Sequence, residues 1–203
     1  MAIRHPAPIE TDPPERRFVM HGVPWLAYVT LRDALDDQAR LKMTYLEGAL
    51  ELISPSMLHE DAKTIIGRLI EVWAMEQDLD LRGFGGARFR REAKQRGLEP
   101  DECYKLGKLH EDDVPDIAIE VIVTNSLVDK MAVYAGLGVP EVWEWCPSTG
   151  TIEVHRLIGD HYERRDRSDV LIGLDVAQLA SFVQPGENQT ALAKSYQAAL
   201  RTR

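Results

Sequence analysis

The fold is decided by the stretch from Val114 to Trp145, which reads VPDIAIEVIVTNSLVDKMAVYAGLGVPEVWEW. Residues 117–123 form a nearly unbroken apolar, β-branched run, which is typical of a strand buried on both faces. Asn125 or Ser126 can cap a following helix of about ten residues, and the Gly and Pro residues at 136, 138 and 140 end it. Residues 141–145 form a second short strand. This order predicts a βαβ unit with parallel strands.

Two carboxylates and a lysine stand out in this unit. Glu120 lies among Ile and Val, and Asp116 lies where the first strand begins. A buried, ionised carboxylate is costly unless it is paired or binds a metal. Because strand side chains alternate, Asp116 and Glu120 are expected on the same face, with Lys130 on the helix that follows. Two interpretations stay open: a Glu120–Lys130 ion pair that only orders the crossover, or a functional site.

Composition narrows the class of protein. The chain has 203 residues, of which 44% are hydrophobic and 28% charged, as expected for one compact globular domain. The formal net charge of −9 argues against a protein that coats nucleic acid through broad electrostatics, although it leaves room for a local basic groove. No long apolar run or signal-peptide core is present, so we expect a cytoplasmic protein without a membrane partner. Cys103 and Cys146 suggest neither a disulfide framework nor a zinc knuckle.

The chain is expected to have three parts. Residues 1–24 read as a proline-rich, extended arm, residues 25–185 as the main domain, and residues 186–203 as a C-terminal helix. Within the main domain, residues 30–33 resemble a capping box and predict a helix to about residue 40. Residues 170–182 predict a short strand followed by a turn of helix.

A hairpin and a long helix precede the central unit. Residues 43–55 alternate about a turn at Glu47-Gly48, which favours a solvent-facing Glu51, although Glu51 could also point into a site shared with Glu120. His59 is expected to open a helix to about Gln77. A capping or hydrogen-bonding role is the simpler interpretation for His59, because a lone histidine is weak evidence for catalysis.

Six of the 24 basic residues of this acidic chain fall within residues 82–96. Within that segment, Arg88 and Arg90 are two residues apart and share one face if the segment is a strand. Lys94 and Arg96 follow and lead toward Asp101. A solvated face is the ordinary interpretation, and a ridge that contacts nucleic-acid phosphates is the functional one.

Carboxylates and a lysine are the residue types that phosphodiester hydrolysis requires. Mg²⁺ binds oxygen ligands, usually a few carboxylates, and it activates water while it relieves phosphate charge. A nearby lysine can orient the attacking water or stabilise developing negative charge. Asp101, Glu120 and Lys130 supply these types, with Asp116 as an addition.

Four runs carry a resemblance to a known family: TYLEGALELISPSMLHE, GLEPDECY, VPDIAIEV and KMAVYAGLGVPEVWEW. They resemble the Uma family of restriction endonucleases, within the PD-(D/E)XK nuclease superfamily, and the match runs from about residue 44 to 157. The resemblance implies an α/β fold with a mixed central sheet flanked by helices, a restriction-endonuclease-like core. The motif's usual third residue would stand at Ile122, so the resemblance implies that Lys130 supplies the lysine.

The resemblance also implies a site and partners. Asp101, Glu120 and Lys130 would be catalytic, Asp101 and Glu120 would bind Mg²⁺ or Mn²⁺ together with Asp116, and Glu51 and His59 would support them. DNA would be the substrate, held by the basic residues Arg88, Arg90, Lys94 and Arg96. Independently of the resemblance, cutting both strands of a duplex commonly requires two active sites, so we expect a homodimer. Val142, Trp143 and Trp145 could be partly exposed and contribute to its surface, although core packing is the simpler interpretation for at least one tryptophan. The alternative is a catalytically silent nucleic-acid-binding or protein-interaction module on a nuclease scaffold.

Overall fold

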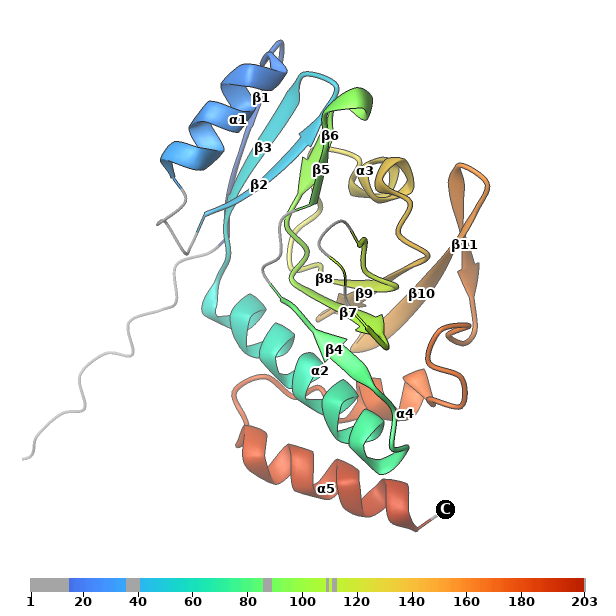
Figure 1. Cartoon of the computed structure of the whole chain (residues 1–203). Coiled ribbons are helices and arrows are strands. Elements are labelled where there is room, and N and C mark those ends of the chain that lie inside the picture. The colour runs from blue at the N-terminus through green and yellow to red at the C-terminus, as the bar shows by residue number, and fades with distance from the viewer. Residues whose placement is uncertain (1–14, 36–40, 86–88, 109, 111–112, 203) are drawn as a thin grey trace, which may run out of the picture.

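The computed structural model describes residues 15–35, 41–85, 89–108, 110 and 113–202. In these residues the chain forms two β-sheets with helices on and between them (Figure 1). The helices are α1 (Trp25–Ala34), α2 (Met57–Glu76), α3 (Lys130–Leu137), α4 (Val176–Ser181) and α5 (Gln189–Arg201).

A six-stranded sheet carries the central βαβ unit. Its order is β11-β10-β9-β8-β7-β4, with β4 (Leu81–Gly83), β7 (Glu102–Leu106), β8 (Ile117–Val121), β9 (Glu141–Cys146), β10 (Thr151–Ile158) and β11 (His161–Arg165). Strands β8 and β9 are parallel and joined through α3, and the other neighbours are antiparallel. The predicted mixed sheet and its parallel crossover are therefore confirmed.

A second sheet of five antiparallel strands has the order β1-β3-β2-β6-β5. Its strands are β1 (Arg16–Met20), β2 (Lys42–Leu46), β3 (Ala49–Ser54), β5 (Phe89–Arg91) and β6 (Arg96–Leu98), and a single 3-10 turn, η1 (Glu92–Lys94), joins the last two. The turn between β2 and β3 lies at Glu47-Gly48, as predicted, and both residues have positive φ. Glycine adopts this conformation without steric cost.

The two faces of the six-stranded sheet carry different helices. Ile117, Ile119 and Val121 of β8 belong to a core with α2, α4 and Tyr196 of α5. Ala118 belongs to a separate core with α3, to which Leu46 and Ala49 of the five-stranded sheet also contribute. Helix α3 therefore lies between the two sheets. Helix α1 covers the outer face of the five-stranded sheet, where its Tyr28 packs with Met43 and Tyr45 of β2 and Leu50 of β3.

Three predicted helix starts were wrong. Helix α1 begins at Trp25, and Thr30 lies inside it, where its hydroxyl donates to Leu26 O at 2.8 Å instead of capping. The predicted extension of this helix over residues 36–40 lies outside the described residues. Helix α2 begins two residues before His59, because Ser56 accepts from His59 N at 3.2 Å. Helix α3 begins only at Lys130 and is capped by Asp129.

Two further predictions about the second half of the chain need correction. Residues 170–175 form no strand, because the buried Glu141 carboxylate accepts from the backbone N–H groups of Asp169 and Val170 and fixes a loop. Val142, Trp143 and Trp145 are all buried, since β9 has neighbours on both edges and packing on both faces. This strand therefore cannot supply a dimer surface. Helix α5 begins at Gln189, is capped by Asn188 and packs on α2.

The boundaries expected for the arm, the main domain and the terminal helix stay predictions. Strand β1, which begins at Arg16 within the expected arm, pairs with β3 from Arg16↔Ser54 to Met20↔Leu50. Residues 1–14 lie outside the described part. No helix in the described residues combines the length and the apolar character needed to cross a membrane.

Candidate active site

The site lies where the inner faces of the two sheets meet beside α3. On β8, Glu120 alternates with the apolar residues that face α2, so its side chain points to the α3 side. In the five-stranded sheet, cross-strand partners place Arg17, Lys42 and Glu51 on one face, because Arg17 and Lys42 both oppose Ile53, two residues from Glu51. The charged residues of both sheets therefore face each other.

Asp101 stands at the start of β7 and is held beside Glu120. Its Oδ2 accepts from the backbone N–H of Val121 at 2.7 Å, and its own N–H donates to Ile119 O. The antiparallel pairing of β7 with β8 creates this neighbourhood, since Glu102 opposes Ile119. The structure thus brings together the two acids that the sequence placed in one site, and both are almost fully buried.

Helix α3 supplies the partners of Glu120. The Lys130 ammonium donates to Glu120 Oε2 at 2.6 Å, and the Tyr134 hydroxyl donates to Oε1. Lys130 and Tyr134 are four residues apart on the helix and therefore project from the same side. Both oxygens of the carboxylate are fixed from one helix, so its plane is set before any ligand arrives.

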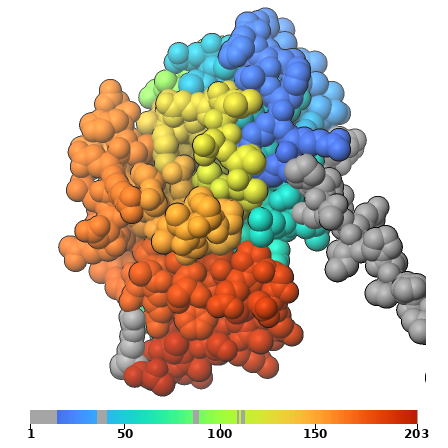
Figure 2. All heavy atoms as spheres, turned by 180° about the vertical axis from the view of Figure 1, so that it is seen from behind, coloured from blue at the N-terminus to red at the C-terminus, as the bar shows by residue number. Residues whose placement is uncertain are grey.

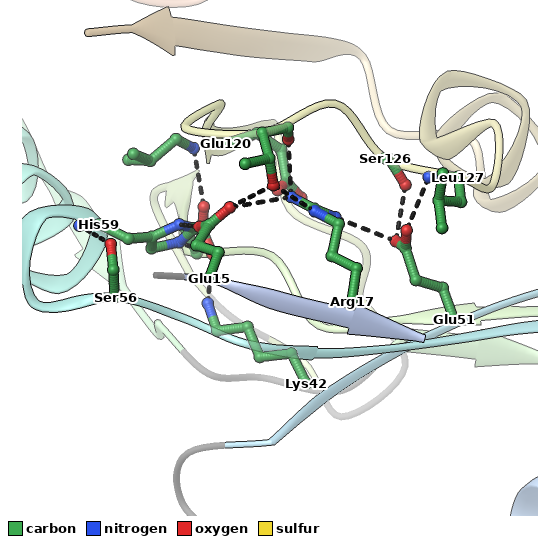
Figure 3. Close-up of polar contacts among 12 residues, drawn as sticks. Glu15, Arg17, Lys42, Glu51, Ser56, His59, Glu120, Ser126 and Leu127 are labelled. Atoms are coloured by element: carbon green, nitrogen blue, oxygen red, sulfur yellow. Dashed lines mark hydrogen bonds and ion pairs between the residues drawn. The ribbon is translucent and has the colours of Figure 1, made fainter. Parts of the chain in front are cut away.

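His59 joins Asp101 to a carboxylate from the N-terminal strand region. Its Nδ1 lies 2.7 Å from Glu15 Oε1, as Figure 3 shows. Its Nε2 lies 2.9 Å from Asp101 Oδ1. The first turn of α2 fixes the backbone of His59, and the Glu15 and Asp101 carboxylates fix the orientation of its imidazole ring. A second cation, the Lys42 ammonium, also pairs with Asp101 Oδ1.

Glu51 is completely buried, so the favoured interpretation of a solvent-facing side chain was wrong. Its carboxylate accepts from Ser126 Oγ at 2.7 Å, from Leu127 N at 2.6 Å and from Arg17 at 3.3 Å. Arg17 in turn donates to Thr124 through Oγ1 and the carbonyl oxygen. The hairpin alternation is regular, but both faces of the hairpin are covered in the fold.

These contacts tie the loop that carries Lys130 to the five-stranded sheet. Residues 122–129 connect Glu120 to Lys130, and Glu51 and Arg17 hold that loop at three residues. From behind, the N-terminal strand and the segment that follows β8 lie side by side (Figure 2). Glu51 therefore supports the site through the loop rather than through direct contact with Asp101 or Glu120.

Burial and pairing shift the pKa values of these groups in different directions. Burial alone would raise the pKa of Asp101, but Lys42 and His59 outweigh it and hold this pKa well below its usual range. Burial raises the pKa of Glu120, and the Asp101 charge adds to that effect against the pull of Lys130. Burial would lower the pKa of His59, but Asp101 and Glu15 raise it to about 9. His59 is therefore a charged imidazolium at neutral pH.

A cavity of about 380 Å³ opens beside this cluster. Its lining combines acidic and basic side chains with one glycine: Lys42, Glu60, Lys63, Gly85, Glu99, Asp101 and Glu102. One water occupies about 30 Å³ in the liquid, so the cavity has room for a hydrated cation and a phosphate oxygen or two. Asp101 is the member of the acidic pair that reaches it.

The donor chemistry fits a hard divalent cation. Mg²⁺ takes one or two carboxylates and fills its remaining positions with waters and phosphate oxygens. Asp101 Oδ2 accepts a single hydrogen bond and keeps a lone pair, as do both oxygens of Glu120. Among the described residues, no three His, Cys, Asp or Glu side chains converge as a ready-made ligand set. Asp101 and Glu120 would therefore hold the ion together with solvent or substrate.

Asp116 does not join this pair. It accepts from Leu106 N at 2.9 Å and pairs with Lys105 at 3.4 Å. Four residues along an extended strand span about 13 Å, so Asp116 and Glu120 share a face but cannot share one ion. The expectation that Asp116 is a metal ligand has no support in this geometry.

The basic residues are split between surface and core. Arg90 on edge strand β5 and Lys94 in η1 are exposed, whereas Phe89 packs against the α3 core from the other face of β5. Arg96 instead pairs with Glu47 at 3.1 Å and packs on α3, where a Cβ on Gly136 would lie 2.2 Å from its Cδ. Arg88 lies outside the described residues.

Sequence reasoning missed Lys42, Glu15, Arg17 and Tyr134 as members of the cluster. Lys42 and the Glu15–Arg17 segment carry no local signal, because their place depends on how the two sheets pack. The spacing of Tyr134 from Lys130 put both on one helix side, which was the available clue.

The fold and the site together define a class of protein. A restriction-endonuclease-like protein is expected to carry a buried acidic pair on neighbouring strands of a mixed sheet, with a lysine from the crossover helix. The chain belongs to the Uma2 family, described as "Putative restriction endonuclease", whose model matches residues 27–183. That match covers more than half of the chain and agrees with the resemblance found in its motifs.

A similar solved structure is "a putative nuclease belonging to DUF820" from Anabaena variabilis ATCC 29413, with 18% identity and a TM-score of 0.45. The similarity covers 76% of this chain and 90% of that one. A search of curated proteins gives no match.

Proposed function

We propose that this protein is a metal-dependent endonuclease that hydrolyses phosphodiester bonds in DNA. The observation that carries the proposal is the pair Asp101 and Glu120, both buried, adjacent through the Val121 N–H, with the Lys130 ammonium 2.6 Å from Glu120. Membership of a family described as restriction endonucleases supports the nuclease class.

Each residue of the cluster would have a distinct task. Asp101 and Glu120 would hold Mg²⁺ or Mn²⁺, which when bound would activate water and neutralise phosphate charge. Lys130 would donate a hydrogen bond that orients the attacking water, or its charge would stabilise the negative charge that develops on the phosphate. Tyr134 keeps the Glu120 carboxylate oriented, and His59 does the same for Asp101.

DNA would be held by the exposed basic residues at one edge of the five-stranded sheet, where Arg90 faces away from the α3 core and lies 4.0 Å from Asp33 of α1. Arg90 and Lys94 stand on the edge of the five-stranded sheet, in a chain whose net charge is −9. Phosphate contacts from such residues would hold the backbone without reading sequence, and the acidic remainder would repel DNA elsewhere.

Incubation of supercoiled plasmid with the protein and Mg²⁺ tests the proposal. We expect the wild-type protein to convert the plasmid to nicked or linear forms, and Asp101→Asn to abolish the conversion. Asp116→Asn is the matched control, because it removes a carboxylate that lies outside the cluster and should retain cleavage. Loss of activity in both variants, or in neither, would contradict the assignment of Asp101.

A second function is favoured by one observation. The cluster contains four carboxylates, Glu15, Glu51, Asp101 and Glu120, and four cationic groups, Arg17, Lys42, His59 and Lys130, so it is charge-balanced without a metal. A catalytically silent nucleic-acid-binding or protein-interaction module would have such a self-neutralised site. Calorimetric titration with Mn²⁺ separates the two: binding that depends on Asp101 supports the nuclease, and its absence supports the silent module.

A homodimer would provide the second active site needed to cut both strands, and light scattering with and without DNA tests that expectation. A buried β9 removes one surface for it, so another face would be required. The cytoplasmic location stays a prediction from the sequence.

A further inference from the structure

Charge balance in the cluster poses a problem for metal binding. The four carboxylates and four cationic groups already neutralise one another, and Asp101 Oδ1 is contacted by two of the cations, Lys42 and His59. A divalent ion at Asp101 adds two positive charges within a few ångströms of both. Like charges repel strongly in a buried site, so a side-chain cation has to withdraw for the metal to enter.

Lys42 is the cation best placed to withdraw. His59 is 2% exposed and is held by a carboxylate on each ring nitrogen. Arg17 is anchored on Thr124 and Glu51, and Lys130 of α3 pairs with Glu120 rather than with Asp101. Lys42 begins strand β2, has 15% side-chain exposure, and lines the 380 Å³ cavity together with Asp101.

The cavity also offers the ammonium a place to go. Glu99 and Glu102 line the same space beside the Lys63–Glu60 ion pair, and a four-carbon side chain can rotate from Asp101 toward these two carboxylates while its backbone stays in β2. Burial would lower the pKa of Lys42, but the Asp101 carboxylate outweighs burial and raises it, so the group stays charged and moves as a cation.

We infer that Lys42 is a displaceable counterion of Asp101, which neutralises this carboxylate in the metal-free protein and withdraws into the adjoining cavity when a divalent cation binds. The inference rests on the proposed function, because it assumes that Asp101 is a metal ligand. It makes Lys42 a positioning residue that keeps the empty site folded and lowers its metal affinity.

Titration calorimetry of the full chain with Mn²⁺ tests the inference. Lys42→Met removes the competing charge, so we expect Mn²⁺ to bind on the order of tenfold more tightly than to wild type, since a unit charge a few ångströms away is worth at least one decade. Lys105→Met is the matched control, because Lys105 is similarly buried and also paired with carboxylates, Asp113 and Asp116, outside the cluster. It should leave the affinity unchanged.

A purely structural role of Lys42 predicts no gain in Mn²⁺ affinity for Lys42→Met. If Lys42 only orients Asp101 for the metal, Lys42→Met will bind Mn²⁺ more weakly or equally well, and either result overturns the inference. If wild type and Lys42→Met both fail to bind Mn²⁺, the metal-dependent function and this inference fall together. Binding by wild type with no gain in the variant overturns the inference alone.

A second measurement does not depend on the variant folding. Acetylation of wild-type lysines with acetic anhydride, read by mass spectrometry, should rise several-fold at Lys42 when Mn²⁺ is added, because the ammonium leaves its carboxylate for the open cavity. Lys105 should react equally with and without the ion. Unchanged or lower reactivity at Lys42 under saturating Mn²⁺ would overturn the inference.

Discussion

The Lys130 ammonium lies 2.6 Å from Glu120 Oε2, in a pair formed across the turn from β8 into α3. Glu120 is 1% exposed, so without this ammonium its carboxylate would lie inside the protein with no cation of the described residues in contact with it. The sequence left open whether the pair only orders the crossover or serves a site. The neighbouring Asp101 favours the second, because an ordering pair has no need of a second buried acid beside it.

Removal of Lys130 should lower the stability of the protein, because it leaves the Glu120 carboxylate unpaired. Lys130→Met leaves Glu120 buried without a cation, which should cost about 3–5 kcal/mol in the free energy of unfolding. Glu120→Gln in the same chain should recover most of that loss, because the uncompensated charge is gone. Urea denaturation of the two single variants and the double variant measures this coupling. Strictly additive effects would contradict a direct interaction.

Glu51 should support the loop that carries Lys130. Glu51→Ala removes the acceptor of Ser126 Oγ and Leu127 N, so we expect a loss of about 2–3 kcal/mol in unfolding free energy and reduced DNA cleavage. Glu163→Ala is the control: this carboxylate is 43% exposed and pairs with Arg165, and its removal should change stability by less than about 0.5 kcal/mol. Equal effects of the two variants would show that Glu51 has no special role.

The charge on His59 makes stability depend on pH. The pKa of His59 is raised to about 9 from an ordinary value of 6.5, so its stabilising contribution is complete below pH 6.5 and is lost as pH rises through 9. The difference in unfolding free energy between metal-free wild type and His59→Gln should therefore shrink by up to about 3 kcal/mol over this window. Urea denaturation in EDTA at pH 6, 7.5 and 9 measures it. A difference that is constant or grows with pH would contradict the charged imidazolium.

The exposed basic residues should act on DNA through its phosphates. The double variant Arg90→Ala, Lys94→Ala should weaken DNA binding equally for unrelated sequences. The slope of log binding constant against log salt concentration should fall in magnitude by about 1.8, because each lost phosphate contact contributes about 0.9. Arg165→Ala is the control, an exposed arginine on β11 that pairs with Glu163. Fluorescence anisotropy in Ca²⁺, across a salt series, gives the slopes. Equal slopes for wild type and the double variant would leave a solvated strand face as the explanation.

The sequence predicted the central unit because its signals are local. The β-branched run at Ile117–Val121 and the stop at Gly138 and Pro140 depend only on neighbours along the chain. Asp101 and Glu120 could be placed together from family motifs. Their contact depends on the pairing of β7 with β8, which no local pattern specifies.

The rest of the site depends on packing between sheets. Glu51 alternates as a solvent-facing residue would, and it is buried because β1 and the loop before α3 cover it. Glu15 and Lys42 belong to segments with ordinary polar composition. The pairing of β1, β2 and β3 brings Lys42 to Asp101 and Glu15 to His59. Asp116 has the right residue type and face, yet it lies too far along the strand.

The rate of plasmid cleavage as a function of Mg²⁺ concentration tests the central claim most directly, with wild type and Glu120→Gln measured side by side. We predict a wild-type rate that rises from zero without Mg²⁺ and saturates, and no Mg²⁺-dependent cleavage above background for Glu120→Gln, whose thermal melt shows it folded. Equal, saturable cleavage by the two proteins, or a folded wild-type protein that never cleaves, would contradict a nuclease centre built on Asp101, Glu120 and Lys130.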